Sequence, residues 1–303
     1  MKSSVAIIGA GNVGSTAAYA LIMRNLVSSL ILIDVDEKRC QGEVYDLIGA
    51  LSFGGASDIR KGSLQEAGQA NIAIIAAGKA QKPNQTRLEL LRENQAIIKS
   101  IIQGMQPLRK DLVIIVVTNP VDILTTLVQD IAGLPRNQIF GSGTMLDSQR
   151  LRSVIGERLT IAQKSIHLYV LGEHGDAQFV AWSLGDIGGV PIIQFPGLNQ
   201  AFLDECAIKA KNYAYEIIAC KGSTSFGIAG CISAYCQNIL FDLNRVTPVS
   251  CFQEEFGICL SMPGVLGARG IKQTLKLPLN KQEYEQLSKS AKIIQEAYHL
   301  IRD

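Results

Sequence analysis

A glycine-rich turn near the N-terminus constrains the fold of this chain more than any other feature. The apolar run at 5–8 predicts a buried strand, and the Ala- and Leu-rich stretch at 15–23 predicts a helix. Between them, Gly9 permits a tight bend, Gly11 lets a pyrophosphate approach the backbone, and Gly14 lets helix and strand pack closely. The helix N-terminus offers free N–H groups to the phosphates. The turn therefore predicts a dinucleotide site.

The residue after the second predicted strand indicates which dinucleotide binds. Residues 30–33 (LILI) form that strand, and Asp34 follows it, about twenty residues past the last glycine. A carboxylate there can accept hydrogen bonds from both adenosine ribose hydroxyls and repels a 2′-phosphate. The next two residues supply no cation, although Lys38 and Arg39 are close enough to keep NADP as an alternative. We expect NAD.

Short apolar strands alternate with helices through residue 143, which predicts a doubly wound parallel sheet of the Rossmann type. Ligands bind beyond the carboxyl ends of such strands, so the glycine turn, Asp34, Gly78 and Asn119 should share one edge with the polar loop at 79–84. The predicted strands lie at 5–8, 30–33, 70–77, 112–117 and 138–140, and the helices at 15–23, 37–51, 86–108 and 121–131.

After Gly143 the pattern changes to mixed α+β without a second glycine fingerprint. We expect helices at 145–159, 203–219, 225–241 and 281–301, strands at 166–171 and within 251–262, and a hairpin over 178–193 that turns at Gly188-Gly189. The chain thus divides into an NAD-binding Rossmann domain, 1–143, and an α+β catalytic and substrate domain, 144–303.

Composition excludes several functional classes. The formal net charge is only +2, and neither half is strongly basic, so no nucleic-acid partner is expected. Seven scattered cysteines without a C-x-x-C pair, with only three histidines, predict reduced thiols and no metal site. No apolar stretch approaches the length of a membrane span or a signal-peptide core. We expect a cytoplasmic protein with no membrane partner.

Four further motifs carry a family resemblance: TNPVD at 118–122, GSGTMLDSQR at 141–150, LGEHGD at 171–176 and KGSTS at 221–225. Together they resemble the L-lactate dehydrogenase family, within the lactate and malate dehydrogenase superfamily. The resemblance covers essentially the whole chain in order. It implies NAD-dependent interconversion of (S)-lactate and pyruvate by a homotetramer, although no arm precedes the first predicted strand.

The physical chemistry of three residues agrees with that activity. Oxidation of a 2-hydroxy acid needs a base for the hydroxyl proton, and histidine, with an ordinary pKa of about 6.5, suits that role. His174 lies between Gly172 and Gly175 on a loop after a strand, where it can reach a substrate. Asp147 would fix its tautomer. Arg150, three residues later on nearly the same helix face, could bind the substrate carboxylate through two parallel hydrogen bonds.

By resemblance, further residues complete the site. Arg87 would polarise the keto oxygen when the loop at 79–84 closes and excludes water. Asn119 would bind substrate or nicotinamide, Ser142 the carboxamide, and Ile228 would pack on the nicotinamide ring. The full set of expected cofactor-binding residues is Gly9, Gly11, Asn12, Val13, Gly14, Asp34, Gly78, Asn119, Ser142 and Ile228.

Substrate choice is expected to depend on Gln81 and Thr224. Malate-type relatives place an arginine at the position of Gln81, and an uncharged glutamine leaves a second substrate carboxylate desolvated and unpaired. Lactate and pyruvate are therefore the expected pair. The alternatives are larger 2-hydroxy acids of the 2-hydroxyisocaproate type, which Asn84 at a usual glycine position keeps open, and malate.

Two other interpretations stay open. A non-catalytic NAD-binding protein could use the same fold, but it would be expected to lack His174 or one of its partners, and all are present. Arg152 and His167 match positions where bacterial relatives bind fructose 1,6-bisphosphate between subunits. The alternative for this pair is a helix charge and a strand histidine at an interface with no effector.

Overall fold

A single nine-stranded sheet organises the protein. The structure, a computed structural model, describes residues 3–79 and 86–302. The strand order is β14-β13-β12-β6-β5-β4-β1-β2-β3. Six strands run parallel: β1 (Ser4–Ile8), β2 (Ser29–Ile33), β3 (Asp58–Lys61), β4 (Ile72–Ile75), β5 (Val113–Val116) and β6 (Ile139–Gly141). Their spatial order, 3-2-1-4-5-6, is that of the Rossmann fold, so the predicted doubly wound sheet is confirmed.

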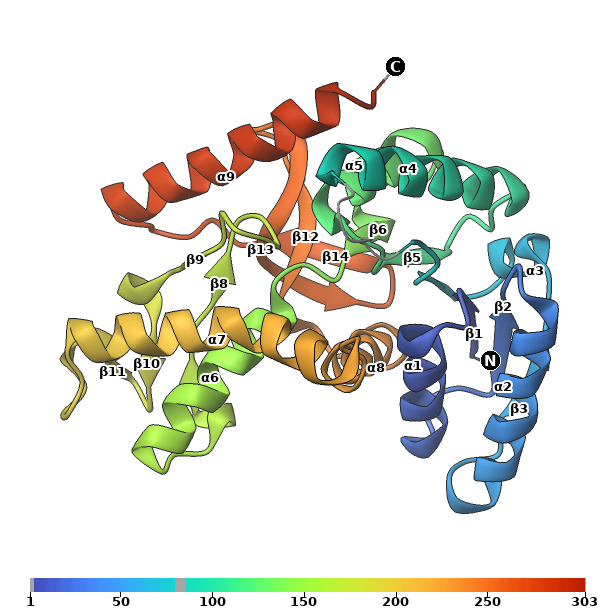
Figure 1. Cartoon of the computed structure of the whole chain (residues 1–303), viewed down its shortest axis with the longest axis horizontal. Helices are drawn as coiled ribbons and strands as arrows, with labels where there is room; N and C mark the ends of the chain where they lie inside the picture. The colour runs from blue at the N-terminus through green and yellow to red at the C-terminus, as the bar shows by residue number, and fades with distance from the viewer. Residues whose placement is uncertain (1–2, 80–85, 303) are drawn as a thin grey trace.

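Helices cover both faces of the parallel strands. The first half contributes α1 (Asn12–Met23), α2 (Glu37–Ala50), α3 (Leu64–Gly68), α4 (Arg87–Gly104) and α5 (Val121–Ile131), with 3₁₀ turns at Leu51–Phe53 and Arg136–Gln138. In Figure 1, α4 and α5 lie above the strands and α1 lies below them, packed against α8 (Phe226–Leu240). This winding brings the carboxyl ends of the strands to one edge, where ligands bind in such folds.

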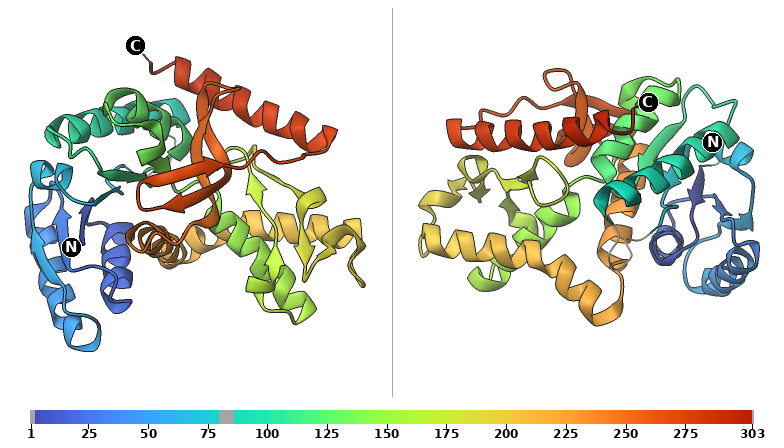
Figure 2. Two further views of the ribbon diagram at one scale, coloured as in Figure 1. Left: turned by 180° about the vertical axis from the view of Figure 1, so that it is seen from behind. Right: turned by 45° about the horizontal axis from the view of Figure 1, so that its top comes forward.

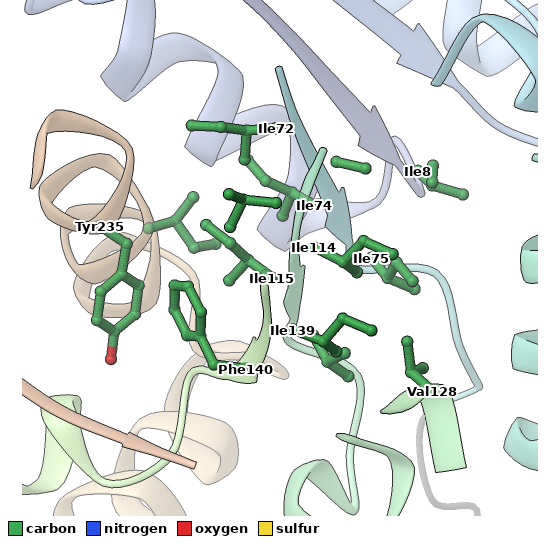
Figure 3. Packing of buried hydrophobic residues seen from close by; sticks show 14 of the residues in the cluster. Ile8, Ile72, Ile74, Ile75, Ile114, Ile115, Val128, Ile139, Phe140 and Tyr235 are labelled. Atoms are coloured by element: carbon green, nitrogen blue, oxygen red, sulfur yellow. The ribbon is translucent and has the colours of Figure 1, made fainter. Parts of the chain in front are cut away.

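The central strands are apolar on both faces, which explains why they appear in the sequence as continuous runs of isoleucine and valine. Ile74 and Ile115 are fully buried, together with most of their neighbours in β4 and β5 (Figure 3). At the end of this core Phe140 meets Tyr235 of α8 edge to face, with ring centroids 5.4 Å apart. That contact ties β6 to a helix from the second half of the chain.

The second half extends the same sheet and adds a smaller core. Strands β12 (Arg245–Gln253), β13 (Ile258–Gly267) and β14 (Gly270–Thr274) are antiparallel, and β12 joins β6 through Ser250 and Gly141. Figure 2 shows the β12–β13 pair between the helices of the first half and α9 (Lys281–His299). A second apolar cluster packs α6 (Met145–Leu159) against α7 (Gln200–Lys221).

The structure corrects several predicted elements in the second half. The expected strand at 166–171 is two strands: β7 (Ile166–His167) pairs with β10 (Asp186–Ile187), and β8 (Val170–Leu171) pairs with β9 (Phe179–Val180). The expected hairpin at 178–193 is therefore wrong in extent. Only β10 and β11 (Val190–Pro191) form it, around glycines with φ of +61° and +87°. Short 3₁₀ turns fill the intervals at Gln163–Ser165, Trp182–Leu184 and Ile192–Gln194.

The elements that sequence reasoning missed or shortened have physical reasons for being inconspicuous. Strand β3, DIRK, lies at the sheet edge with only Ile59 buried, so it carries no apolar run. Strands β12 and β13 extend beyond the predicted 251–262 and contain Pro248 and Pro263 opposite one another, and proline argues against a central strand. Within residues 3–79 and 86–302, no helix is long and apolar enough to cross a membrane.

Candidate active site

The glycine turn has the geometry that a bound pyrophosphate requires. Gly9 has a φ of +103°, and a Cβ there would lie 2.5 Å from the backbone nitrogen of Ala77. A Cβ on Gly14 would lie 1.8 Å from the carbonyl oxygen of Gly9, so helix and strand pack too closely for any side chain. By contrast, among the described residues no side chain or distant backbone atom beyond the chain neighbours lies within 4 Å of the Cβ position of Gly11. The turn is therefore closed toward the sheet and open above Gly11.

The N-terminus of α1 is also open to an anion. Gly11 is its N-cap residue, and no side chain of the described residues caps it. The first backbone N–H groups of a helix have no partner within the helix, and they favour a phosphate or a carboxylate. Asn12 and Val13 begin this helix.

Asp34 lies beside the turn, as its position after β2 predicted. Its Oδ2 accepts the backbone N–H of Ala10 at 2.6 Å, and its Oδ1 accepts that of Asp36 at 2.9 Å. These two bonds fix the carboxylate and leave lone pairs on both oxygens for ribose hydroxyls. The nearby Arg39 donates to Asn12 at 3.3 Å and pairs with Glu43 at 3.7 Å, so this cation already has partners of its own.

Distant segments meet at this edge of the sheet. Asn12 donates to Ser223 of the KGSTS motif at 2.9 Å, which connects α1 to the loop after α7. Asn94, fully buried in α4, accepts the backbone N–H of Lys79 at 2.8 Å and donates to the carbonyl oxygen of Asn119 at 2.8 Å. The backbones after β4 and β5 are thus held together. A Cβ on Gly78 would lie 2.4 Å from Thr118 Cγ2, which explains a glycine there.

The predicted proton-transfer residues lie together. His174 Nδ1 is 2.8 Å from Asp147 Oδ2, and Asp147 Oδ1 is 3.9 Å from Arg150 Nη1. Arg150 also donates to the hydroxyl of Thr224 at 3.3 Å. Asp147 and Arg150 project from one face of α6, as their spacing predicted, and are 6% and 9% exposed. The His174 side chain is 28% exposed, so part of the ring is accessible.

The electrostatics of the pair favour a protonated histidine. Burial alone would lower the pKa of His174, but the charge of Asp147 and its hydrogen bond outweigh burial and raise that pKa to about 9. Burial alone would raise the pKa of Asp147, but the His174 charge and hydrogen bond, followed by Arg150, hold it below the usual value. At neutral pH the pair is therefore an imidazolium and a carboxylate.

Backbone hydrogen bonds to β13, α9 and α5 hold the first three residues of the loop that carries His174, residues 172–174. Gly172 exchanges backbone hydrogen bonds with Ser261 of β13, at 3.1 and 2.9 Å. The backbone N–H of Glu173 donates to Ser290 of α9 at 3.1 Å. The backbone N–H of His174 itself donates to Oδ2 of Asp122, in the first turn of α5, at 2.7 Å.

Sequence reasoning assigned no role to Asn94, Asp122, Ser261 or Ser290. Asp122 ends the TNPVD motif, so its place in a recognised motif was a usable signal. The two serines and the asparagine have no such sequence signal, because their importance depends on partners that the fold brings in from distant segments.

The remaining predicted residues lie as follows. Ser142 is buried, and its backbone is held by Val116 and by the hydroxyl of Tyr235, which donates to the Ser142 carbonyl oxygen at 2.7 Å. Ile228 is half-buried in the first turn of α8. Arg87 begins α4, capped by Thr86, and its side chain lies outside the description. Gln81 and Asn84 lie outside the described residues.

The predicted effector pair has partners within its own chain. Arg152 donates to the carbonyl oxygen of Leu168 through Nε and Nη2, at 2.9 and 2.7 Å, and lies over the Tyr169 ring. His167 Nδ1 is 3.3 Å from Asp186 Oδ1. Burial lowers the pKa of Arg152. An effector role for the pair stays a prediction.

The sheet order and the open glycine turn define a dinucleotide-binding protein of the Rossmann class. Comparison with known families gives the particular family. Residues 3–141 match the lactate/malate dehydrogenase NAD-binding domain, and residues 144–301 match the lactate/malate dehydrogenase alpha/beta C-terminal domain. The chain belongs to the lactate/malate dehydrogenase family, as the motifs predicted.

Individual relatives agree. L-lactate dehydrogenase A of Rhizopus oryzae is 44% identical over 296 residues, which cover 97% of this chain and 92% of the relative. L-lactate dehydrogenase of Synechococcus sp. strain JA-3-3Ab is 38% identical over the full length of both chains. The minor L-lactate dehydrogenase from Enterococcus mundtii, solved in a ligands-bound form, has a TM-score of 0.95 and 33% identity, covering 99% of this chain and 98% of that one. These names favour lactate over the malate and 2-hydroxyisocaproate alternatives.

Proposed function

We propose that this protein is an NAD-dependent L-lactate dehydrogenase that interconverts (S)-lactate and pyruvate. The observation that carries the proposal is the His174–Asp147 pair, with the buried Arg150 beside it. A dinucleotide-binding fold alone does not require such an arrangement, because binding needs no proton carrier. The relatives named L-lactate dehydrogenase support the same choice.

His174 would exchange a proton with the oxygen on the second carbon of the substrate. Asp147 holds Nδ1 and favours the imidazolium, so the accessible part of the ring can donate a proton to pyruvate or accept one from lactate. Arg150 would bind the substrate carboxylate, with Thr224 keeping its guanidinium in place. Arg87 would polarise the keto oxygen, and Gln81 would face the third carbon of the substrate.

The observed turn fits NAD. The uncapped helix N-terminus and the open space at Gly11 suit a pyrophosphate, and the fixed Asp34 carboxylate suits ribose hydroxyls. When bound, NAD would accept or supply the hydride. The residues proposed to hold it are Gly9, Gly11, Asn12, Val13, Gly14, Asp34, Gly78, Asn119, Ser142 and Ile228.

The proposal also covers the roles of the two domains, the assembly of subunits and the cellular location. We assign residues 1–143 to cofactor binding and 144–303 to the substrate, in a homotetramer. Exposed aromatic side chains support association: Tyr19 and Phe226 are 50% and 75% exposed and line one groove with α2. Seven free thiols suit a reducing cytoplasm. Fructose 1,6-bisphosphate stays a proposed effector at Arg152 and His167.

A substrate panel tests the activity. Purified protein is mixed with NADH and, in turn, pyruvate, 2-oxobutyrate, 2-oxoisocaproate or oxaloacetate, and the loss of NADH absorbance is followed. We expect the highest kcat/KM with pyruvate. A preference for oxaloacetate or 2-oxoisocaproate would transfer the assignment to one of the alternatives. Absence of turnover with every acid, despite NADH binding, would indicate the non-catalytic protein.

A further inference from the structure

Asp122 is a second carboxylate in contact with residue 174. It lies in the first turn of α5, its side chain is only 3% exposed, and its Oδ2 accepts the His174 backbone N–H at 2.7 Å. Among the backbone hydrogen bonds that Gly172, Glu173 and His174 make to β13, α9 and α5, this is the one that acts on His174. Its acceptor is a carboxylate, whereas the acceptors at Ser261 and Ser290 are a backbone carbonyl oxygen and a hydroxyl. A charged acceptor makes a hydrogen bond about twice as strong as a neutral one.

The surroundings of Asp122 offer few hydrogen bonds to offset the burial of its negative charge. Its Oδ1 is buried and has no hydrogen-bond partner among the described residues, and the same is true of the buried Ser250 hydroxyl of β12. That hydroxyl nevertheless lies close enough to lower the pKa of the carboxyl. The other titratable groups that face it are His174 and Glu173 on the loop, with the thiols of Cys251 and Cys259 on β12 and β13.

The balance of these effects gives Asp122 an unusual titration. Burial raises its pKa to about 6, against the lowering effects of Ser250, the His174 N–H and the imidazolium charge. In turn, the Asp122 charge raises the pKa of His174, after the larger effect of Asp147. The buried carboxylate and the partly exposed imidazolium therefore stabilise each other's charged forms. Glu173 and Arg150 act in the opposite sense on Asp122 and His174 respectively.

We propose that Asp122 is a positioning residue for His174: its ionised carboxylate fixes the backbone of the proton carrier and stabilises the imidazolium in addition to the ring contact with Asp147. The inference rests on the proposed function, because it assumes that His174 carries the proton. A neutral residue at 122 would weaken the hold on the loop and make the imidazolium less stable. The pKa of His174 would then fall.

The test uses Asp122→Asn, which keeps the shape and an acceptor oxygen but removes the charge. The chain has only three histidines, so protein labelled with ¹³C in the histidine rings gives few ring signals, and the one missing in His174→Asn belongs to His174. We expect the midpoint of its NMR titration to fall by about 0.5–1 pH unit in Asp122→Asn. The upper pH limit of pyruvate reduction should fall in parallel.

Ser290→Ala is the matched control. It removes a hydroxyl that holds the same loop through Glu173 and Ala177 but carries no charge. The loop should loosen while the His174 midpoint stays in place. An unchanged midpoint in Asp122→Asn overturns the proposal. So does an equal change in Ser290→Ala, because loop displacement alone would then explain the result.

A second variant covers the case in which Asp122→Asn does not fold. Ser250→Ala keeps Asp122 and its bond to His174 but removes the hydroxyl that lowers the carboxyl pKa. As Asp122 ionises at low pH, it should produce an inflection in the titration of the His174 signal. In Ser250→Ala this inflection should move to higher pH, and an unmoved inflection overturns the proposal. The NMR titration needs no turnover, so it is independent of the activity. If the substrate panel gives no turnover while the midpoints move as expected, the proposed function fails and the link between the residues stands.

Discussion

Replacing Asp147 with asparagine tests the central electrostatic argument. The pKa of His174 is raised from 6.5 to about 9, although burial alone would lower it, and Asp147 is the main cause of the rise. An increase of that size corresponds to about 3 kcal/mol in favour of the imidazolium. Asp147→Asn preserves the shape and an acceptor for Nδ1 but removes the charge. The pKa of His174 should therefore return to about 6.5 or below.

The consequence for catalysis follows from the protonation state. Pyruvate reduction needs His174 protonated, so in the wild type activity should be lost as the pH rises through about 9. In Asp147→Asn the same loss should occur near pH 6.5. At pH 8 the protonated fraction alone then falls about 30-fold, and kcat/KM for pyruvate should fall by at least that factor.

The assay is steady-state NADH oxidation with pyruvate from about pH 5 to 10, at constant ionic strength, with both proteins saturated with NADH. Binding of NADH, followed by its fluorescence, should be unchanged and serves as the control for folding. The reasoning is refuted if the variant loses activity at the same pH as the wild type, even when its rate is lower at every pH. Such a result would mean that Asp147 orients the ring without setting its charge.

Three further predictions follow. His174→Asn should lower turnover by roughly 10²–10⁴-fold with NADH binding intact, and more than half the wild-type rate would remove His174 from the mechanism. Gln81→Arg should move the kcat/KM ratio by about 10–10³-fold toward oxaloacetate, measured against pyruvate on both proteins, whereas equal losses would give Gln81 a purely structural role. Asn94→Ala should lower the free energy of unfolding in urea by about 2–4 kcal/mol, because it removes the part-buried hydrogen bonds of its side chain to backbone groups of Lys79 and Asn119; a change under about 1 kcal/mol would contradict this.

The parallel half of the fold was predictable because its signals are local. Strands β1, β4 and β5 are buried on both faces, so each appears as an unbroken apolar run between breakers. Edge strand β3 and the two-residue strands after α6 have no such run. Their pairing depends on where the chain folds back, and a stretch such as 166–171 can contribute to two small sheets without any change in its local pattern.

The candidate site divides in the same way. His174, Asp147 and Arg150 could be proposed from sequence because each needs a particular side chain, and the i,i+3 spacing on α6 places the last two on one face. The residues that hold these three side chains in place could not be proposed from the sequence. Asn94 and Ser290 act through hydrogen bonds to backbone groups that lie 15 or more residues away in the chain. Any buried polar side chain could make such a hydrogen bond, so the residue type does not indicate this role in the sequence.

Asp122 is intermediate between the residues that could be proposed from the sequence and those that could not, because of its place in a motif. It belongs to the TNPVD motif, but the role expected of that motif fell on Asn119, in the loop after β5. Three positions separate the two residues: Asn119 lies in the loop after β5, while the carboxylate in the first turn of α5 reaches the loop after β8, 52 residues away. The same short segment would thus serve the cofactor edge and the proton carrier. A motif that must make both contacts tolerates fewer substitutions than a motif that makes only one of them.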